Sequence, residues 1–411
     1  MALFGHKLKA LLRGQRATLS KENRARMEGL HGAVWIHAAS VGEFEQARPL
    51  IERIVESQKS KDNRLKIVVT FFSPSGYEAR KDYPLADGVF YLPLPTRLNA
   101  RRFLEALQPK MAIFIKYEFW PAYIRELHKR KIPVYSICAI FRPTQRFFHW
   151  YGIGALRLLK QFTHIFVQDE DSRALLTSHG VQHVSLAGDT RFDRVKQVQS
   201  HPCSKDLSPA EMFVNGCERV IVAGSTWPED EQLLAQYMAN DEQLTANGQQ
   251  PKLILVPHEI DEAHLHFIFN LFQGRLVKYS AVTRPMPAIS RQNILQQADV
   301  LLVDTIGLLS SIYRFGQVAY IGGGFGVGIH NTIEAAVYGM PVIFGPEYRN
   351  FREAKGLIAA GAARSIKNYG ELEAALNTAL EQHGAIGAKA AEYVQSELGA
   401  TNRIYNAIFK I

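Results

Sequence analysis

The stretch "GGGFGVGIHNTIEAAVYGMPVIFGP" (Gly322–Pro346) lies in the C-terminal half of this sequence. Its first seven residues include five glycines, which follow the apolar run "QVAYI" (Gln317–Ile321) and precede a helix-like segment. A strand that passes through a glycine-rich turn into a helix is typical of an open α/β sheet, and such turns often hold phosphates. The two commonest phosphate loops are excluded, because no Gly-Lys-Ser/Thr follows and no register of the glycines gives G-x-G-x-x-G.

The polar residues that follow these glycines allow two interpretations. Asn331 is placed to cap a helix, Glu334 to complete the cap three residues later, and Gly339 to end the helix. Alternatively, the Glu334 carboxylate accepts hydrogen bonds from two neighbouring ribose hydroxyls, while the glycines let a phosphate or sugar approach the backbone.

Apolar, β-rich runs alternate with helix-like stretches along the whole chain, which predicts parallel sheets with helices on both faces. In the first half these runs are Ala33–Ser40, Lys66–Ser73, Gly88–Leu94, Met111–Lys116, Val134–Ala139 and His164–Asp169; in the second they are Arg219–Ser225, Lys252–His258, Val300–Asp304, Val318–Gly323 and Pro341–Gly345. The polar stretch near residues 195–215 separates them, so we expect two α/β domains, 31–198 and 199–385. A basic segment (1–30) precedes them, and a helix (386–411) is expected to return to the first domain.

Ligands of such sheets bind beyond the carboxyl ends of the strands, so the residues there are candidates for chemistry. In the first domain, Ser40, Gly42 and Glu43 lie between a strand and a helix. Ser40 and Glu43 match a capping box, which the spacing alone favours, and Glu43 is also placed to act as a general base. Glu118 follows another strand in "IKYEFWP"; it is either a functional acid among aromatics or an exposed acid before the helix-starting Pro121.

Three further strand ends carry polar candidates. Arg191 in "GDTRFD" either binds a phosphate or carboxylate or forms an ion pair with a neighbouring aspartate. Ser225 and Thr226 in "AGSTWPEDE" suit an anion at a helix start, although the acids that follow also stabilise the helix dipole without a ligand. His258 follows the next strand, where a structural role and a binding role are equally consistent with its position. Two open sheets with a glycine-rich site on the second favour a nucleotide-sugar transferase.

The chain of 411 residues carries a net charge of +9, of which residues 1–27 contribute +6. Within that segment Phe4, Leu8, Leu11 and Leu12 recur on one face of a helix. Such a basic amphipathic helix either docks on an anionic membrane or packs on its own domain. Nucleic acid is not an expected partner, since no aromatic residues interleave the basic ones. Three cysteines without metal-type spacing indicate neither a disulfide framework nor a metal site.

Taken in chain order from Trp35 to Pro346, the motifs resemble those of the 3-deoxy-D-manno-octulosonic acid (Kdo) transferases of Gram-negative bacteria. The motifs are "WIHAASVGE", "IKYEFWP", "GDTRFD", "AGSTWPEDE", "DTIG" (Asp304–Gly307) and the glycine-rich stretch. The resemblance implies a GT-B fold, with two Rossmann-like domains whose parallel sheets face a central cleft. It further implies an inverting, metal-independent transfer of Kdo from CMP-Kdo to a lipid A precursor of the lipid IVA type, in lipopolysaccharide core biosynthesis.

The resemblance also assigns roles to the candidates. It makes Glu43 the general base, Glu118 a second essential acid and Glu334 a ribose ligand. Donor contacts are then expected from Ser225, Thr226, His258, Gly323, Gly324, Asn331 and Glu334, and acceptor or cleft contacts from Ser40, Gly42 and Arg191. Two positions depart from the family pattern, because His258 stands where an arginine is frequent and Arg191 where a lysine is frequent.

The expected partners are CMP-Kdo, a lipid A precursor and an anionic membrane surface, with neither a cofactor nor a metal ion. We expect the cytoplasmic face of the inner membrane, reached peripherally or through an N-terminal anchor that this sequence lacks. Two alternatives stay open. One is another GT-B nucleotide-sugar enzyme, including a UDP-sugar 2-epimerase-like protein, and the other is a membrane-binding module without catalysis.

Overall fold

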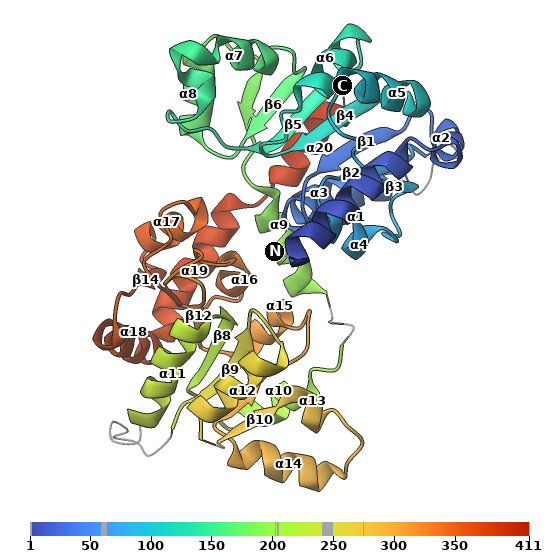
Figure 1. Ribbon diagram of the computed structural model, residues 1–411. Helices are drawn as coiled ribbons and strands as arrows, with labels where there is room; N and C mark the ends of the chain where they lie inside the picture. The colour runs from blue at the N-terminus through green and yellow to red at the C-terminus, as the bar shows by residue number, and fades with distance from the viewer. Residues whose placement is uncertain are drawn as a thin grey trace. The chain divides into compact units, whose positions relative to one another are not determined.

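A computed structural model describes residues 2–58, 64–201, 203, 205–240, 250–273 and 275–410 (Figure 1). The side chains of residues 2–8 and 10 lie outside the described part, which leaves the predicted apolar face of Phe4 and Leu8 untested. The chain divides into two compact units. Unit 1 comprises Met1–Arg194 and Glu397–Ile411, and unit 2 comprises Val195–Ser396.

Unit 1 is built on a parallel sheet of seven strands in the described part of the chain, in the order β3-β2-β1-β4-β5-β6-β7. The strands are β1 (Val34–Ala38), β2 (Ile67–Phe71), β3 (Gly88–Tyr91), β4 (Met111–Ile115), β5 (Val134–Ala139), β6 (His164–Val167) and β7 (Val184–Leu186). The order reverses between β1 and β4, the arrangement of a doubly wound sheet. All residues of β1, β2 and β4 are buried, as expected for strands covered on both faces.

Helices cover both faces of this sheet, and the alternation along β1 assigns its residues to them. Val34, Ile36 and Ala38 pack in a core with α3 (Val41–Glu56) and α20 (Ala400–Phe409), while Trp35 packs in a second core on the other face. The helices that contribute to the second core are α2 (Lys21–Glu28), α5 (Arg97–Leu107), α6 (Pro121–Lys129), α7 (Ile153–Leu159) and α8 (Glu170–Ser178). The remaining helices are α1 (Ala2–Thr18), α4 (Pro74–Arg80) and α9 (Thr190–Ser200), which continues into unit 2.

Unit 2 also has a parallel sheet of seven strands among its described residues, in the order β10-β11-β9-β8-β12-β13-β14. The strands are β8 (Val220–Thr226), β9 (Lys252–Pro257), β10 (Leu276–Lys278), β11 (Val300–Leu302), β12 (Val318–Ile321), β13 (Val342–Phe344) and β14 (Ala363–Ser365). The order reverses between β8 and β12, so the glycine-rich stretch begins at the switch point of this sheet.

The helices of unit 2 are α10 (Ser208–Val214), α11 (Pro228–Asn240), α12 (Glu262–Leu271), α13 (Tyr279–Val282), α14 (Ala288–Gln297), α15 (Leu309–Ile312), α16 (Ile333–Ala336), α17 (Arg352–Ala359), α18 (Tyr369–Glu381) and α19 (His383–Glu397). Its core joins the apolar faces of α11, α12 and α18 to the sheet.

The two ends of the chain each form a pair of helices. At the N-terminus α1 ends at Thr18, and Ser20 caps α2 by accepting a hydrogen bond from the Asn23 amide. At the C-terminus α19 belongs to unit 2, whereas α20 packs against α3 of unit 1. Gly399, with φ at 94°, takes the left-handed conformation between these two helices. None of the described helices combines the length and apolar character that crossing a bilayer requires.

Candidate active site

The two acids of the first half of the chain come together at the switch point of the unit 1 sheet. Strand β1 leads through Ser40 to Glu43 in the first turn of α3, and the neighbouring strand β4 leads through Lys116 to Glu118. Lys116 has a φ of 60°, a left-handed turn that ends the strand directly before Glu118. Adjacent parallel strands end at the same edge of a sheet. The two carboxylates are therefore close enough for the negative charge of Glu118 to raise the pKa of Glu43.

Glu43 makes the contacts of a helix cap and also has the properties of a base. Its Oε2 accepts a hydrogen bond from the Ala39 amide at 2.6 Å, and its own amide donates to Ser40 Oγ at 3.4 Å. The capping interpretation is therefore confirmed as a contact. Burial and the nearby Glu118 carboxylate raise the pKa of Glu43 to about 7, against the lowering effects of the Ala39 amide and Lys116. A carboxyl group with this pKa exchanges a proton readily at neutral pH.

Glu118 lies among aromatic side chains and is largely buried. Its side chain is 13% exposed. The alternative interpretation, an exposed acid before the helix-starting Pro121, is therefore wrong. Trp120 Nε1 donates to Glu118 Oε2 at 2.5 Å, and His37 Nε2 lies 3.2 Å from the same oxygen. The Trp120 ring in turn stacks on Phe72, with ring centroids 5.0 Å apart. The Trp120 indole thus holds one oxygen of the carboxylate in a defined place, with the His37 ring beside it.

His37 is a member of this site that the sequence analysis did not single out. It is fully buried in β1, and its Nδ1 lies 2.9 Å from the Thr70 hydroxyl on the neighbouring strand β2. The signal was present, because His37 begins the motif that contains Glu43 and alternation places it on the face of Trp35. What the pattern did not indicate is the partner, since the pairing of His37 with Thr70 depends on strand register.

Of the other predicted residues of unit 1, Arg191 forms an ion pair within the protein and Gly42 lies at the surface. Arg191 pairs with Asp189, with a distance of 2.8 Å between Arg191 Nε and Asp189 Oδ2. Burial acts to raise the pKa of Asp189, but Arg191 and a hydrogen bond from Gln46 hold it below its usual value. Gly42 is exposed, and an added Cβ there would meet only Ser40 Oγ at 4.0 Å. Contacts of these residues with an acceptor stay a prediction.

In unit 2 the first switch-point strand, β8, ends in Ser225 and Thr226. Ser225 has a φ of 55° and shifts the register of β8 against β9. Thr226 is fully buried, and its hydroxyl donates to Glu231 at 2.9 Å. Asp230, which precedes Glu231 in the first turn of α11, accepts hydrogen bonds from the Trp227 amide at 2.9 Å and the Gly323 amide at 2.8 Å. These acids were predicted to act on the helix dipole, and Asp230 also ties the β8 turn to the glycine-rich stretch.

The glycines of that stretch are required by neighbouring backbone. A Cβ on Gly322 would lie 2.3 Å from the carbonyl oxygen of Ser225, and one on Gly324 would lie 2.6 Å from the Gly345 backbone. Gly323 has a φ of 88°, and its amide already donates to Asp230. Gly326, in contrast, has open space around its Cβ position. The sequence predicted that these glycines let a ligand approach the backbone. At Gly322 and Gly324, other backbone segments of the protein occupy that space.

Three rings form a stack at the carboxyl ends of β8 and β9 and beside the glycines. The Trp227 and His258 rings lie 4.9 Å apart between centroids, and His258 and His330 lie 4.4 Å apart. Trp227 Nε1 donates to His330 Nε2 at 3.1 Å. Burial and the nearby His258 lower the pKa of His330 to about 4, so this imidazole is neutral at pH 7. His258 was predicted here from its place after a strand, whereas Trp227 and His330 were not predicted, although both stand within the quoted motifs.

Asn331 and Glu334 follow this stack and pair with each other. Asn331 Nδ2 donates to Glu334 Oε1 at 2.8 Å, and Asn331 Oδ1 accepts from the Ile333 amide at 3.2 Å. Asn331 therefore holds the first amide of α16, although the N-cap position of this helix is Thr332, whose side chain makes no capping bond. Glu334 accepts from the Asn331 side chain. Gly339, with a φ of 71°, follows the short helix α16, as predicted.

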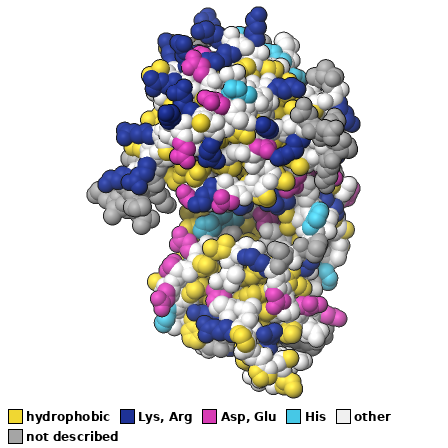
Figure 2. All heavy atoms as spheres, turned by 90° about the vertical axis from the view of Figure 1, so that its right-hand side faces the viewer, with side chains coloured by type: hydrophobic (Ala, Val, Ile, Leu, Met, Phe, Trp, Pro, Cys, Tyr) yellow, Lys and Arg dark blue, Asp and Glu magenta, His cyan; other side chains and the backbone are white. Residues whose placement is uncertain are grey.

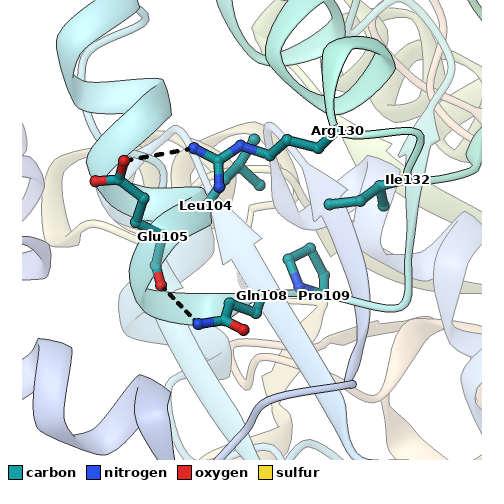
Figure 3. Close-up of a pocket in the computed structure, with 6 residues that line it drawn as sticks. All are labelled: Leu104, Glu105, Gln108, Pro109, Arg130 and Ile132. Carbon is teal, nitrogen blue, oxygen red and sulfur yellow. Dashed lines mark hydrogen bonds and ion pairs between the residues drawn. The ribbon is translucent and has the colours of Figure 1, made fainter.

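A pocket in unit 1 lies away from these residues (Figure 3). It is lined by Leu104, Glu105, Gln108, Pro109, Arg130 and Ile132, at the end of α5 and before β5. This edge of the sheet carries the amino ends of β4 and β5, opposite to the strand ends that bear Glu43 and Glu118. Across the described ranges, no group of three or more His, Cys, Asp or Glu side chains is arranged to hold a metal ion.

Two solved structures share this fold over most of their length. The chain superposes on a UDP-GlcNAc 2-epimerase from Neisseria meningitidis with a TM-score of 0.64 and 16% identity, covering 92% of this chain and 100% of the other. A UDP-N-acetylglucosamine 2-epimerase from Listeria monocytogenes gives 0.62 and 14%, covering 92% and 96%. Together with the two doubly wound sheets, these likenesses define a GT-B fold.

Sequence comparison is more specific. Residues 12–194 match the family model described as 3-deoxy-D-manno-octulosonic-acid transferase. Kdo transferases from Rickettsia prowazekii (28% identity; 87% of this chain, 74% of the relative) and Haemophilus influenzae (28%; 91% and 86%) align along most of the sequence. The resemblance seen in the motifs is thereby confirmed, and the chain is a glycosyltransferase related to the Kdo transferases.

Proposed function

We propose that this protein transfers Kdo from CMP-Kdo to a lipid A precursor of the lipid IVA type, with Glu43 as the general base. The observation that carries the proposal is the pair of carboxylates at the switch point of unit 1, where Glu43 has a pKa of about 7. The Kdo transferases to which the chain is related support Kdo transfer as the activity. We assign acceptor binding to unit 1 and donor binding to unit 2.

The residues fit one chemical step. Glu43 removes the proton from an acceptor hydroxyl while the hydroxyl oxygen attacks the anomeric carbon of Kdo. The bond between that carbon and the CMP phosphate oxygen breaks, and its electron pair leaves with CMP, so attack from the opposite side inverts the configuration. A base with a pKa close to the working pH is the most effective in such a transfer. Burial, together with the negative charge of Glu118, keeps the pKa of Glu43 in that range.

For the donor we propose the polar groups around the ring stack of unit 2. His330 accepts a hydrogen bond from Trp227 at Nε2, which leaves the proton of the neutral ring on Nδ1 as a donor for a phosphate or carboxylate oxygen. Ser225, His258 and the Asn331–Glu334 pair would contribute the other contacts. The Gly323 amide and the Thr226 hydroxyl already donate hydrogen bonds to Asp230 and Glu231. We therefore assign Gly323, Thr226 and Gly324 to the conformation of the glycine-rich loop and not to direct donor contacts. No metal ion is assigned to the phosphate.

An anionic membrane surface is the proposed location of the acceptor, at the cytoplasmic face of the inner membrane. Exposed cations lie on α2 and the neighbouring α5, namely Lys21, Arg24, Arg26, Arg97, Arg101 and Arg102, and Figure 2 shows Lys and Arg side chains gathered over unit 1. Leu98 on α5 is 55% exposed beside them. Cations around an exposed apolar side chain suit a surface of anionic lipid.

Vesicle flotation tests this surface. We expect the protein to float with anionic vesicles and not with neutral ones. Binding should be lost in high salt and in an Arg101→Glu/Arg102→Glu variant.

The decisive test of the proposed function is the Glu43→Gln variant. We expect it to bind CMP like the unaltered protein and to transfer no Kdo from CMP-Kdo to lipid IVA, with the product followed by mass spectrometry. Retained transfer would reduce Glu43 to a helix cap. The same spectra count the Kdo units added to each acceptor.

The structural likeness to epimerases defines a second candidate, an enzyme acting on UDP-sugars. Thermal unfolding in the presence of nucleotides separates the two, because a ligand that binds the folded state raises the melting temperature. Protection by CMP and not by UDP is expected from the proposed function. Protection by UDP alone would overturn it in favour of the epimerase-like enzyme.

A further inference from the structure

A line of hydrogen bonds crosses the unit 1 sheet and ends on Glu118. Trp35 Nε1 donates to Thr70 Oγ1 at 2.8 Å, and the same hydroxyl lies 2.9 Å from His37 Nδ1. His37 Nε2 then meets Glu118 Oε2 at 3.2 Å, which also accepts from Trp120 at 2.5 Å. Trp35, Thr70 and His37 are fully buried, so the line is shielded from water over most of its length.

The ends of this line limit the direction of its hydrogen bonds. An indole N–H can only donate, so Thr70 Oγ1 accepts from Trp35, and its own hydrogen is available to His37 Nδ1. An ionised carboxylate can only accept, so His37 donates to Glu118 when Nε2 carries the ring proton. The Trp120 N–H is directed at both Glu118 Oε2 and His37 Nε2, with 3.0 Å between Trp120 Nε1 and His37 Nε2, and the Thr70 carbonyl oxygen lies 3.1 Å from Nδ1. These two contacts suit the opposite tautomer, so the position of the ring proton is what the NMR experiment below measures.

We propose that His37 is a positioning residue of the transfer reaction, held as the Nε2–H tautomer by Trp35 and Thr70 so that it fixes the Glu118 carboxylate beside Glu43. This inference rests on the proposed role of Glu43 as the base. His37 does not touch the substrate in this proposal. It acts through Glu118, whose position decides how strongly its charge opposes ionisation of Glu43.

The groups around Glu43 make the consequence measurable. Burial and Glu118 raise its pKa, while the Ala39 amide and Lys116, from the segment after β4, lower it. The adjacent Tyr117 hydroxyl interacts with Glu43 and is itself faced by Arg142 and Asp169. If the bond from His37 is lost, the Glu118 carboxylate is held by Trp120 alone, and we expect it to lie less often beside Glu43. The pKa of Glu43 then falls by part of its shift, because burial, the largest cause, remains.

Thr70→Val is the matched perturbation, because valine keeps the shape of threonine and removes only the hydroxyl. The ring proton of His37 is then expected to move to Nδ1, where the carbonyl oxygen of residue 70 lies 3.1 Å away. Histidine ¹⁵N NMR of the free enzyme, with the His37 signal identified in a His37→Gln sample, reports which nitrogen is protonated. We expect Nε2–H in the unaltered protein and in Thr70→Ser, and Nδ1–H in Thr70→Val. A ring protonated on Nδ1 in the unaltered protein would overturn the proposal.

The second test is the pH dependence of kcat/KM for Kdo transfer. In Thr70→Val we expect kcat at pH 8 to fall and the acid limb to move by about 0.5–1 pH unit toward lower pH, because less of the opposing charge remains near Glu43. Thr70→Ser should retain the limb of the unaltered protein, as should His164→Gln, which removes a half-buried histidine on β6 that bonds Ser185. A lower kcat with an unmoved limb in Thr70→Val would show that the line is only structural.

A third measurement separates the failure of this proposal from failure of the proposed function. Carboxyl ¹³C NMR titration of the free enzyme, with Glu43→Gln identifying the signal, follows the pKa of Glu43 without any turnover. If Glu43→Gln transfers Kdo normally while Thr70→Val still lowers the Glu43 pKa, the general-base assignment is wrong and the positioning role of His37 stands. If the pKa of Glu43 is the same in Thr70→Val, the positioning role is refuted whatever the activity.

Discussion

Replacing Glu43 with glutamine is expected to stabilise the folded protein above pH 7 while it abolishes transfer. Burial beside Glu118 raises the pKa of Glu43 from 4.5 to about 7, so the folded protein binds a proton there more tightly than the unfolded chain does. The free energy of unfolding therefore falls as the pH rises from 4.5 to 7 and stays low above that range. Glutamine keeps the size of the side chain and an acceptor for the Ala39 amide. It carries no negative charge, so burial and Glu118 no longer destabilise the folded state at this position.

The magnitude follows from the pKa difference of about 2.5 pH units, which at about 1.4 kcal/mol per unit is worth about 3.5 kcal/mol. A negative charge in the first turn of α3 also stabilises the helix, by up to about 1 kcal/mol, and this contribution is lost in the variant. We therefore expect Glu43→Gln to be more stable than the unaltered protein by about 2.5–3.5 kcal/mol at pH 8. At pH 4.5, where half of the unfolded chains carry the ionised acid, the difference should already be small, and well below that pH it should vanish.

Urea unfolding at pH 4.5, 6 and 8 measures this difference, and Glu45→Gln on the same helix is the matched control. Burial acts to raise the pKa of Glu45, but Arg80, Arg194 and Arg48 lower it below its usual value. Its charge contributes stability that is present above pH 4.5 and lost as the pH falls below it, so Glu45→Gln should be less stable at pH 8. A Glu43→Gln protein that loses stability at pH 8, or a difference independent of pH, would refute the reasoning.

Three further predictions concern the second unit and the metal. Gly322→Ala should destabilise unit 2 by about 1–3 kcal/mol or more in urea unfolding, because the new Cβ would lie 2.3 Å from the Ser225 carbonyl oxygen, whereas Gly326→Ala, with nothing within 4 Å, should be neutral. Asp230→Asn replaces a carboxylate that accepts three hydrogen bonds, including that of the Gly323 amide, so we expect the loop to shift and CMP binding by calorimetry to weaken; unchanged CMP affinity would contradict a role of this loop in donor binding. Transfer should persist after exhaustive dialysis against EDTA, and activity restored only by added metal would contradict the metal-free mechanism.

The sequence predicted best what depends on local pattern. The alternation of apolar runs and helix-like stretches predicted two parallel α/β sheets, which is confirmed, because buried parallel strands are continuous apolar runs. Glu43 and Glu118 were chosen as candidates because ligand sites follow strand ends, and the strand order brings these two acids together. Neither motif predicts that strand order. It follows from which strands neighbour β1, with β4 beside it although two strands separate them in the chain.

What the sequence did not predict depends on contacts between distant segments. Asp230 looked like an ordinary first-turn acid, and its hydrogen bond to Gly323 joins residues 93 positions apart. The glycines were assigned to ligand access because a flexible turn and a tight backbone crossing have the same composition. Thr70 had no visible role at all, since a threonine in a β-rich run is typical of strands, and only the register of β1 with β2 sets its hydroxyl against His37.

The capping and general-base interpretations of Glu43, which the spacing presented as alternatives, describe one carboxylate. The hydrogen bond from the Ala39 amide favours the ionised form and lowers the pKa, while burial and Glu118 raise it, and the result of about 7 is the balance of these effects. Without the cap, the same burial would push the pKa higher and leave less of the base ionised at neutral pH. The cap also fixes the side chain through Oε2, so the carboxylate is held before any substrate arrives. A helix start at a strand end is therefore a suitable place for a neutral-pH base, because the backbone that needs a cap also orients the group and sets its pKa.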